Sequence, residues 1–292
     1  MNTITDIPTL PLRPVDGHKG TFGRVLIVGG SQGFSGAPAL AAKAALRSGA
    51  GLVRVAVPTS VQPVVAALDP CYTTIALPED RQGQSNDKAT AQLLKSAAEN
   101  DVVAFGPGAG TGRGVKQALL ALLAVKDLPL VVDADGLNVL ATLTGPGNWV
   151  QNKKARLILT PHPGEMKRLW AGLFREPLPS DRTEQAARLA QYADCSVVLK
   201  GAGTVVTDGQ NVYINTTGNP GMATAGAGDV LTGVIAALCG QGLAPFDAAV
   251  LGVYVHGRAG DIAANAIGQI GLIATDIIDT LKNAFHEMEN SR

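Results

Sequence analysis

The sequence predicts a doubly wound α/β fold, in which a mostly parallel central sheet carries helices on both faces. Short β-branched runs alternate along the chain with alanine-rich runs that have helical spacing. The strand runs are almost wholly apolar, which is typical of strands buried on both faces. The chain has 292 residues, of which 46% are hydrophobic, so it can bury a large core, and we expect residues 1–292 to form one domain.

The first half of the chain contains five pairs of a strand and a helix. Each expected strand is rich in Val, Leu or Ile, and a helical pattern follows it, as in successive βα units. The predicted strands are Arg24–Val28, Leu52–Val57, Asp101–Phe105, Leu130–Val132 and Leu157–Thr160. The predicted helices are Gly36–Ser48, Val61–Leu68, Gly114–Val125, Gly136–Leu140 and Pro163–Trp170.

The second half begins with strands and ends with helices. The Asp208-Gly209 pair is typical of a hairpin turn between two strands, and we expect this strand-rich run at one edge of the sheet. Its strands are predicted at Ser196–Leu199, Thr204–Thr207 and Val212–Asn215. Helices are predicted to begin near Asp229 and to cover Pro245–Asn265 and Thr275–Phe285, and mobile loops are predicted at Gln82–Asp87 and Leu173–Asp181.

The charge balance excludes partners that need a strong general field. The 24 basic and 24 acidic residues cancel, so nothing favours nucleic acid or an anionic membrane surface. The sequence has no run of about 20 apolar residues and no N-terminal basic and then apolar segment, so we expect a cytoplasmic protein. Cys71, Cys195 and Cys239 are far apart and lack metal-ligand spacing, which predicts buried thiols rather than disulfides or a zinc site.

Glycine-rich loops follow two of the predicted strands. The first strand ends in Gly29-Gly30-Ser31, and the third is followed by four glycines between Gly106 and Gly112. Ligands of doubly wound sheets bind beyond the carboxyl ends of the strands, where glycine lets a ligand approach the backbone. Two interpretations stay open: these loops bind a large flat ligand, a phosphate or a ribose, or they use glycine merely to turn.

Charged side chains follow three other strands. Asp133 and Asp135 come after one of them, and Asp135 is either a helix N-cap or a contact to magnesium through water. His162 is held between two prolines, which predicts an aimed ligand contact, while Glu165 either complements a helix dipole or holds a water on magnesium. Lys200 at the end of a strand can reach a nucleotide phosphate, although a lone lysine is more often a solvated surface residue.

The segment Gly226-Ala227-Gly228-Asp229 leads directly into an apolar helix. Glycine lets consecutive N–H groups converge on one anion at the positive end of the helix dipole, and phosphate suits such a site. Asp229 is expected to stay ionised there and to accept a proton from a hydroxyl lined up with phosphorus. The segment therefore predicts a phosphoryl-transfer site, and the alternative is an ordinary tight turn before a core helix.

Seven segments of the chain occur in the order that one known family shows. They are Lys19–Arg24, Ser35–Pro38, Gly106–Gly110, Asp133–Asn138, Thr160–Glu165, Lys200–Thr204 and Asn219–Asp229. In these segments the chain resembles the ADP-dependent NAD(P)H-hydrate dehydratases, a branch of the ribokinase-like superfamily, which implies a three-layer sandwich. Where ribokinase-like kinases have Asn-x-x-Glu, this chain has His162-Pro163-Gly164-Glu165, a departure that fits the dehydratase branch and weakens the case for a sugar kinase.

The resemblance implies a role for each matched position. Asp229 is the implied catalytic residue at the reacting hydroxyl, and Glu165 is the implied metal contact, through water. The implied substrate-binding residues are Ala37, Gly110 and His162. The implied nucleotide-binding residues are Lys200, Gly201, Ala202, Gly203, Thr204 and Gly228.

The implied reaction is the dehydration of the S form of hydrated NADH or NADPH (NADHX, NADPHX). ADP is the implied phosphoryl donor and Mg²⁺ the implied cofactor, and AMP and phosphate are the by-products. The resemblance also implies a homo-oligomer, for which a tetramer is one compatible state. Many bacterial relatives carry an N-terminal epimerase domain; no room for one is expected ahead of His18, so a separate epimerase is the expected functional partner.

Three other functions match parts of the pattern. A small-molecule kinase of the same fold would phosphorylate a vitamin precursor or sugar and release the product intact. A non-catalytic nucleotide sensor would keep the glycines but need no aspartate base. A Rossmann oxidoreductase is disfavoured, because Gly29-Gly30 lacks the Gly-x-Gly-x-x-Gly spacing and no acidic residue follows about twenty positions on at the end of a second strand.

Overall fold

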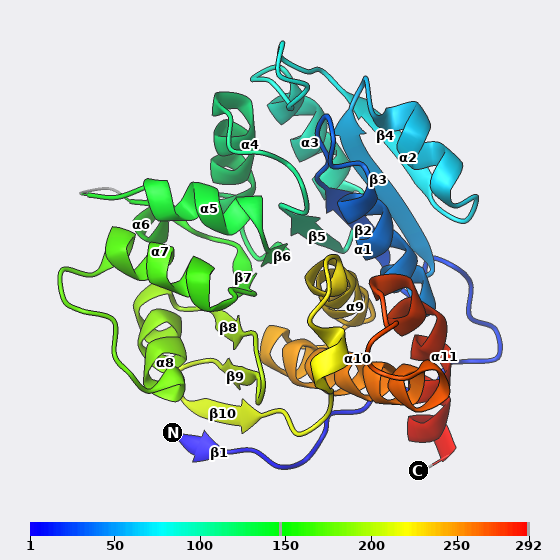
Figure 1. Ribbon diagram of the computed structural model, residues 1–292. Helices are drawn as coiled ribbons and strands as arrows, with labels where there is room; N and C mark the ends of the chain where they lie inside the picture. The colour runs from blue at the N-terminus through cyan, green and yellow to red at the C-terminus, as the bar shows by residue number, and fades with distance from the viewer. Residues whose placement is uncertain (146–147, 291–292) are drawn as a thin grey trace.

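The computed structural model describes residues 1–145 and 148–290, and a ten-stranded sheet runs through its centre (Figure 1). The strand order is β1-β10-β9-β8-β7-β6-β5-β2-β3-β4, and all neighbours are parallel except β9, which is antiparallel to both β8 and β10. The strands are β1 Asn2–Thr3, β2 Arg24–Val28, β3 Leu52–Pro58, β4 Thr73–Leu77, β5 Val102–Phe105, β6 Pro129–Val132, β7 Arg156–Leu159, β8 Ser196–Leu199, β9 Val205–Thr207 and β10 Asn211–Ile214.

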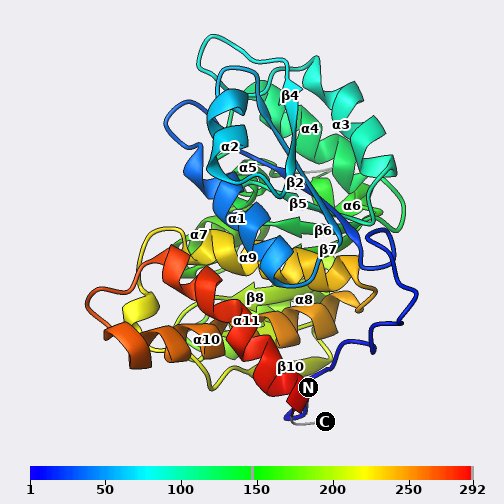
Figure 2. The same cartoon turned by 90° about the vertical axis from the view of Figure 1, so that its right-hand side faces the viewer.

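Helices cover both faces of this sheet and make three layers (Figure 2). One layer contains α1, α2, α9, α10 and α11, and the other contains α3 through α8. The helices are α1 Gly36–Arg47, α2 Gln62–Leu68, α3 Ala89–Ala98, α4 Arg113–Leu123, α5 Asp135–Thr142, α6 Trp149–Asn152, α7 Pro163–Leu173, α8 Arg182–Ala193, α9 Ala227–Gly240, α10 Pro245–Ile267 and α11 Ala274–Asn290. A 3₁₀ turn at Pro220–Met222 precedes α9.

The apolar strands explain the two layers. Along β2, Val25 and Ile27 pack into the layer of α1 and α9, while Leu26 and Val28 pack into the layer of α4. All four side chains are at most 3% exposed, as expected for a strand that is covered on both faces. The fold class predicted from the sequence is therefore confirmed.

Five of the described strands and helices were absent from the predicted pattern: β1, β4, α3, α6 and α8. The strand β4 begins with two threonines and is only partly buried, so its apolar signal is weak. Helices α3 and α8 bury a stripe that is mainly alanine and lies between polar residues, and the predicted pattern did not pick it out. The predicted hairpin is confirmed: β9 and β10 are antiparallel, and Gly209 in the turn has a φ of +87°. The short strand β1 pairs with β10 and forms the outer edge.

The cysteines are only partly as expected. Cys195 and Cys239 are buried, and burial raises the pKa of each thiol to about 12. Cys71 is exposed, so the prediction of a buried thiol was wrong there. It follows α2 at the surface, where its amide N–H donates to the Asp69 carboxylate. No helix in the described part of the chain has the length and hydrophobicity that crossing a membrane requires.

Candidate active site

Several predicted site residues gather at the carboxyl ends of central strands. Strands β5, β6, β7 and β8 are parallel, so the loops after their carboxyl ends lie side by side. Lys200, after β8, reaches across β7 and places its Nζ 2.7 Å from Oδ1 of Asp133, after β6. The same Nζ lies 3.9 Å from Oε2 of Glu165, at the start of α7. The amino end of α9 lies over this group, because a Cβ on Gly228 would be 3.3 Å from Lys200 Nζ.

Asp133 is the buried anchor of the site. Only 1% of it is exposed, and both carboxylate oxygens are used. Oδ1 accepts from Lys200 Nζ, and Oδ2 accepts at 2.8 Å from the hydroxyl of Thr232, one turn along α9 from Asp229. Asp133 therefore ties the ends of β6 and β8 to the helix that carries the expected base.

Lys200 carries its charge underneath the amino end of α9. Burial opposes this charge, but the carboxylates of Asp133, Glu165 and Asp229 outweigh it, so the pKa of Lys200 is raised. A lysine in this position is a fixed cation rather than a solvated surface residue. The surface interpretation of Lys200 was therefore wrong, and the side chain lies where an anion at the α9 turn would meet it.

Asp229 is partly exposed in the first turn of α9. Burial raises its pKa to about 7, and the nearby negative charge of Asp133 adds to the increase, while Lys200 opposes it. Asp229 was expected to stay ionised because the helix dipole favours negative charge there; with a pKa of about 7 it is only partly ionised at neutral pH, so this expectation holds only in part. A carboxyl group with a pKa near neutrality suits a general base better than a fully ionised one does.

The two glycines of the α9 turn differ in their roles. Gly226 is the N-cap and has a φ of +90°, as predicted for a turn that needs glycine. Gly228 lies within the first helical turn and is not among the residues with positive φ, so the prediction of a special backbone conformation was wrong for it. What Gly228 supplies is the absence of a side chain above Lys200. The first amide N–H groups of a helix have no intrahelical acceptor, so those of this turn are available to an anion.

His162 and Glu165 form a reciprocal cap on α7. The ring Nδ1 of His162 accepts from the backbone N–H groups of Gly164 and Glu165, at 2.9 and 3.3 Å. Oε2 of Glu165 accepts from the N–H of His162 at 2.8 Å. The pKa of His162 is lowered by burial and by the charges of Lys200 and Arg168, which leaves a neutral ring with its proton on Nε2. His162 thus has a structural role in addition to any ligand contact.

Glu165 is a buried acid rather than a surface charge. It is 5% exposed, and burial raises its pKa to about 7 although Lys200 opposes the shift. Glu165 lies in the first turn of α7, where it can complement the helix dipole as one interpretation expected, but it is buried there and is not a surface charge. No group of three His, Cys, Asp or Glu side chains in residues 1–145 and 148–290 is arranged to bind a metal directly.

Asp135 holds a neighbouring loop instead of capping its own helix. It is the first residue of α5, and Ala134, with a φ of +50°, takes the N-cap position, so the N-cap interpretation was wrong. Oδ2 of Asp135 accepts from the N–H of Gly110 at 2.9 Å, and Oδ1 accepts from Asn138 Nδ2 at 3.2 Å. Asp135 thereby positions Gly110, one of the expected substrate-binding residues.

The glycine loops after β2 and β5 pack backbone against backbone. The N–H of Gly30 donates to the Pro107 carbonyl at 2.8 Å, and Gly29 leaves no room for a Cβ beside the same carbonyl. The hydroxyl of Ser31 donates to the Gly108 carbonyl at 2.8 Å. Close approach of two chain segments therefore accounts for these glycines without a ligand, and Ala37 in the first turn of α1 lies beside Gly108.

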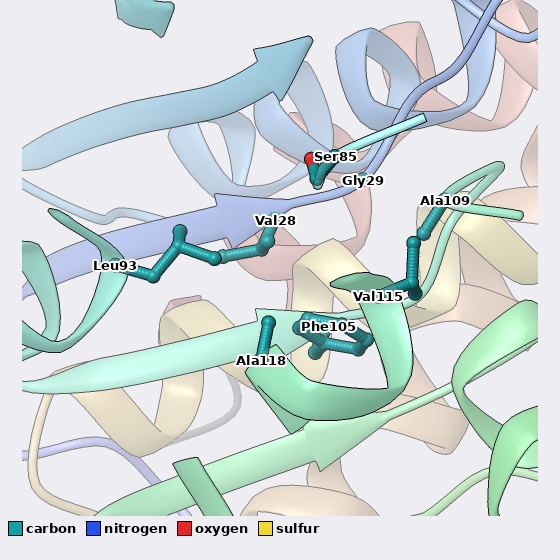
Figure 3. Close-up of a pocket in the computed structure, with 8 residues that line it drawn as sticks. All are labelled: Val28, Gly29, Ser85, Leu93, Phe105, Ala109, Val115 and Ala118. Atoms are coloured by element: carbon teal, nitrogen blue, oxygen red, sulfur yellow. The ribbon is translucent and has the colours of Figure 1, made fainter. Parts of the chain in front are cut away.

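A small cavity of about 10 Å³ lies beneath these loops (Figure 3). It has room for no more than about one water molecule and is lined mainly by apolar side chains, so it belongs to the packing and not to the site. Its lining residues are Val28, Gly29, Ser85, Leu93, Phe105, Ala109, Val115 and Ala118.

The loop expected to be mobile at residues 82–87 lies over the second glycine loop, where Gln84 Oε1 accepts from the N–H of Gly112 at 2.8 Å.

Three polar residues near the site were missed in the sequence. Thr232 bonds to Asp133 from α9, and His256 on α10 is buried near Ala227 at the start of α9, where its Nε2 has no hydrogen-bond partner. Burial lowers the pKa of His256 to about 4, so this ring is neutral. Asp261 on α10 accepts from the N–H of Gly218 at 2.9 Å and from Asn219 Nδ2 at 3.0 Å. Each of them stands alone among the mostly apolar residues of a long helix, so the sequence carried no distinct signal for them.

Helices α1 and α9 cross in direct contact beside the site. Gly233 leaves no room for a Cβ against the Ala41 carbonyl, and Gly226 packs against Leu40. Ala37 and Asp229 each precede this crossing by four residues on their own helices. The crossing therefore fixes the two helix starts relative to one another.

Comparison with known proteins identifies the family. A family model described as NAD(P)H-hydrate dehydratase matches residues 25–283. The bifunctional NAD(P)H-hydrate repair enzyme Nnr of Moorella thermoacetica is 49% identical over 96% of this chain and 52% of its own length. The ADP-dependent (S)-NAD(P)H-hydrate dehydratase of Neisseria meningitidis serogroup B is 39% identical over 91% of this chain and 86% of its own length. The chain spans about half the length of most of the curated relatives it matches.

Solved structures agree in fold. The ADP/ATP-dependent NAD(P)H-hydrate dehydratase of Bacillus subtilis, co-crystallised with ATP and Mg²⁺, has a TM-score of 0.78 at 31% identity and covers 96% of this chain and 94% of its own. Ribokinase of Thermotoga maritima has a TM-score of 0.55 at 16% identity and covers 89% of this chain and 99% of its own, so it shares the fold alone. The fold is ribokinase-like, and the chain belongs to the NAD(P)H-hydrate dehydratase family.

Proposed function

We propose that this protein is an ADP-dependent (S)-NAD(P)H-hydrate dehydratase that repairs hydrated NADH and NADPH. The observation that carries the proposal is the position of Asp229, which is partly exposed in the first turn of α9, has a pKa of about 7 and lies beside the partly buried cation of Lys200. The names of relatives that are 39% to 49% identical support the substrate class, and they do not favour a small-molecule kinase.

The first step is phosphoryl transfer. Asp229 takes the proton of the hydrate hydroxyl while that oxygen bonds to the terminal phosphorus of ADP and the bond to AMP breaks. The amide N–H groups of the α9 turn and the Lys200 cation stabilise the charge on the phosphate in transit. Gly228 allows the phosphate to approach this cation, because no side chain lies between them.

The second step is elimination. Phosphate leaves far more readily than hydroxide, so the lone pair of the ring nitrogen expels it as the carbon–oxygen bond breaks. Loss of a proton from the adjacent ring carbon restores the double bond of the dihydronicotinamide. The products are NADH or NADPH, AMP and inorganic phosphate.

The remaining expected residues divide between the two ligands. We assign Ala37, Gly110 and His162 to the hydrated dinucleotide. Their places support this: Ala37 lies at the start of α1, Gly110 in the loop that Asp135 holds, and His162 at the start of α7. The turn from Lys200 through Thr204, together with Gly228, is assigned to ADP. Its exposed glycines directly follow β8.

Magnesium fits the charge of the site. Three carboxyl groups, those of Asp133, Glu165 and Asp229, lie around the cation of Lys200, so they can supply more negative charge than Lys200 neutralises. Because Mg²⁺ usually keeps several waters and binds through few carboxylates and the substrate phosphates, the absence of a three-ligand group in the described residues suits it. Glu165 would hold the ion through water, and the ion would neutralise charge on the phosphates of ADP.

The wider setting is also a proposal. One sheet that contains all ten described strands supports a single domain over residues 1–292. The free, buried thiols of Cys195 and Cys239 are compatible with the reducing cytoplasm. We further propose a homo-oligomer, such as a tetramer, and a separate epimerase as functional partner, a link that the bifunctional repair enzymes among the relatives support.

The test mixes the protein with Mg²⁺, hydrated NADH and either ADP or ATP. Recovery of the dihydronicotinamide absorbance, with AMP and phosphate formed from ADP, is the expected result. A phosphorylated hydrate that accumulates without NADH would instead identify a kinase. Binding of ADP without any turnover would identify a nucleotide sensor and overturn the proposal.

A further inference from the structure

The turn from Lys200 to Thr204 is built around one arginine that the expected site does not contain. Arg182 is the first residue of α8, and its guanidinium lies inside the turn. Its Nη1 donates to the carbonyl of Ala202 at 2.6 Å and is 3.4 Å from that of Gly203. Its Nη2 donates to the carbonyls of Leu199 at 3.0 Å and Lys200 at 3.1 Å.

These contacts fix the direction of the backbone N–H groups. In a trans peptide the C=O and N–H point in opposite directions. Carbonyls that face Arg182 therefore direct the N–H groups of the following residues, Gly201, Gly203 and Thr204, away from it. Residues 201–203 are exposed, and no backbone acceptor in the described chain binds the N–H groups of Gly201 or Gly203. The turn thus presents donors to solvent, as an anion-binding nest does.

The glycine at position 201 fits the arginine. Gly201 has a φ of +138°, and a Cβ there would be 3.1 Å from Nη2 of Arg182. The guanidinium therefore occupies the space that a side chain would need. Gly203, with a φ of +60°, completes the reversal of the chain.

The charge of Arg182 is not neutralised by a carboxylate. None of the ion pairs in the described residues includes Arg182, and its buried Nε has no hydrogen-bond partner. By contrast Arg188, two turns along the same helix, pairs with Glu176 and Glu184. A guanidinium whose partners are backbone carbonyls keeps a positive potential behind the turn, which favours phosphate in front of it.

We propose that Arg182 is a positioning residue for ADP: it holds the 200–204 turn open with its N–H groups directed at the nucleotide. This inference rests on the proposed assignment of that turn to ADP. Lysine cannot replace it, because one ammonium group cannot bridge carbonyls on both sides of the turn in a fixed fork.

The test compares Arg182→Lys with Arg188→Lys, the same substitution on the same helix. We expect Arg182→Lys to raise the KM for ADP and the Kd for Mg²⁺–ADP measured by calorimetry about tenfold, a change equivalent to 1.4 kcal/mol. The KM for the hydrate and kcat at saturating ADP should change less than about twofold, and Arg188→Lys should change none of these. Equal losses for ADP and hydrate, or an unchanged Kd for ADP, would overturn the inference.

A second variant covers the case of a general loss of structure. Arg182→Ala should bind ADP still more weakly, and millimolar guanidinium chloride should restore part of the affinity where the same concentration of sodium chloride does not. Absence of this rescue in a variant with native circular dichroism would count against the inference. The calorimetric arm needs no turnover, so failure of the dehydration reaction in the wild type would refute the proposed function without deciding the role of Arg182.

Discussion

Lys200 Nζ lies 2.7 Å from Asp133 Oδ1 and joins the end of β8 to the end of β6 across the strand between them. The two residues are 67 positions apart in the sequence. Their pairing places one cation under the α9 turn and leaves Asp229 and Glu165 as acids with raised pKa values. The chemistry of the site depends on this pair.

Breaking the pair should cost stability as well as activity. Lys200→Met leaves the Asp133 carboxylate buried with only Thr232 as a side-chain partner, and we expect a loss of about 3–5 kcal/mol in the free energy of unfolding. The double variant Asp133→Asn, Lys200→Met should recover part of that loss, because no charge is left unpaired. Urea unfolding of both variants measures the difference, and a double variant no more stable than Lys200→Met would contradict this reading.

The two glycines of the α9 turn should respond differently to alanine. Gly228→Ala places a methyl group 3.3 Å from Lys200 Nζ in a helical position, so we expect a weaker affinity for ADP, by about tenfold, with stability changed by less than about 1 kcal/mol. Gly226→Ala must adopt a φ of +90° and meets Leu40, so it should lower the Tm. Thermal unfolding and ADP calorimetry on the two variants separate these effects.

Replacing the proposed base should remove the reaction but keep the fold. Asp229→Asn has nearly the same shape but cannot accept the proton, so kcat should fall about a hundred- to ten-thousand-fold. ADP affinity should stay within a few fold of that of the wild type. Full activity in this variant, measured by recovery of NADH, would refute the assignment.

The same substitution should make the protein more stable above neutral pH. The pKa of Asp229 is raised from 3.8 to about 7, so between these values the folded protein holds a proton that the unfolded chain has lost. Stability from this group is therefore present at low pH and falls as the pH rises through 7. At pH 8 we expect Asp229→Asn to gain about 1 kcal/mol, or roughly 2 °C in Tm, and to gain nothing at pH 4.

The pH dependence of turnover should show the same pKa of about 7. Because the base must be unprotonated, kcat/KM should fall about tenfold per unit as the pH drops below 7. Glu165 also has a pKa of about 7, so Glu165→Gln is the control. The fall of kcat/KM below pH 7 should persist in that variant. If it disappears, the group that titrates is Glu165 and not Asp229.

The cap and the ligand contact of His162 can be separated. Asparagine is a good N-cap, so His162→Asn should keep the stability of α7 but raise the KM for the hydrate about tenfold. His162→Ala should show the same change in KM and also lose about 1 kcal/mol of stability. An unchanged KM in both variants would limit His162 to its capping role.

Much of the fold followed from local patterns, because buried parallel strands such as β2 and β6 are nearly all apolar. Helix α8 has only alanine and one leucine as buried apolar residues among polar ones and was missed, and Arg182 was missed with it. The site segments were found because glycine and charge at strand ends are local signals. The partner of Lys200, the raised pKa of Asp229 and the true role of Gly228 depend on which strands become neighbours, which a local pattern does not contain.

The crossing of α1 and α9 leaves the backbone of Gly233 directly against Ala41. Sliding either helix would force these backbones into collision, so the distance between the starts of the two helices is fixed. On the proposed assignment of Ala37 to the hydrate and Gly228 to ADP, an inhibitor that joins a nicotinamide mimic to a pyrophosphate could therefore use a stiff spacer of one fixed length.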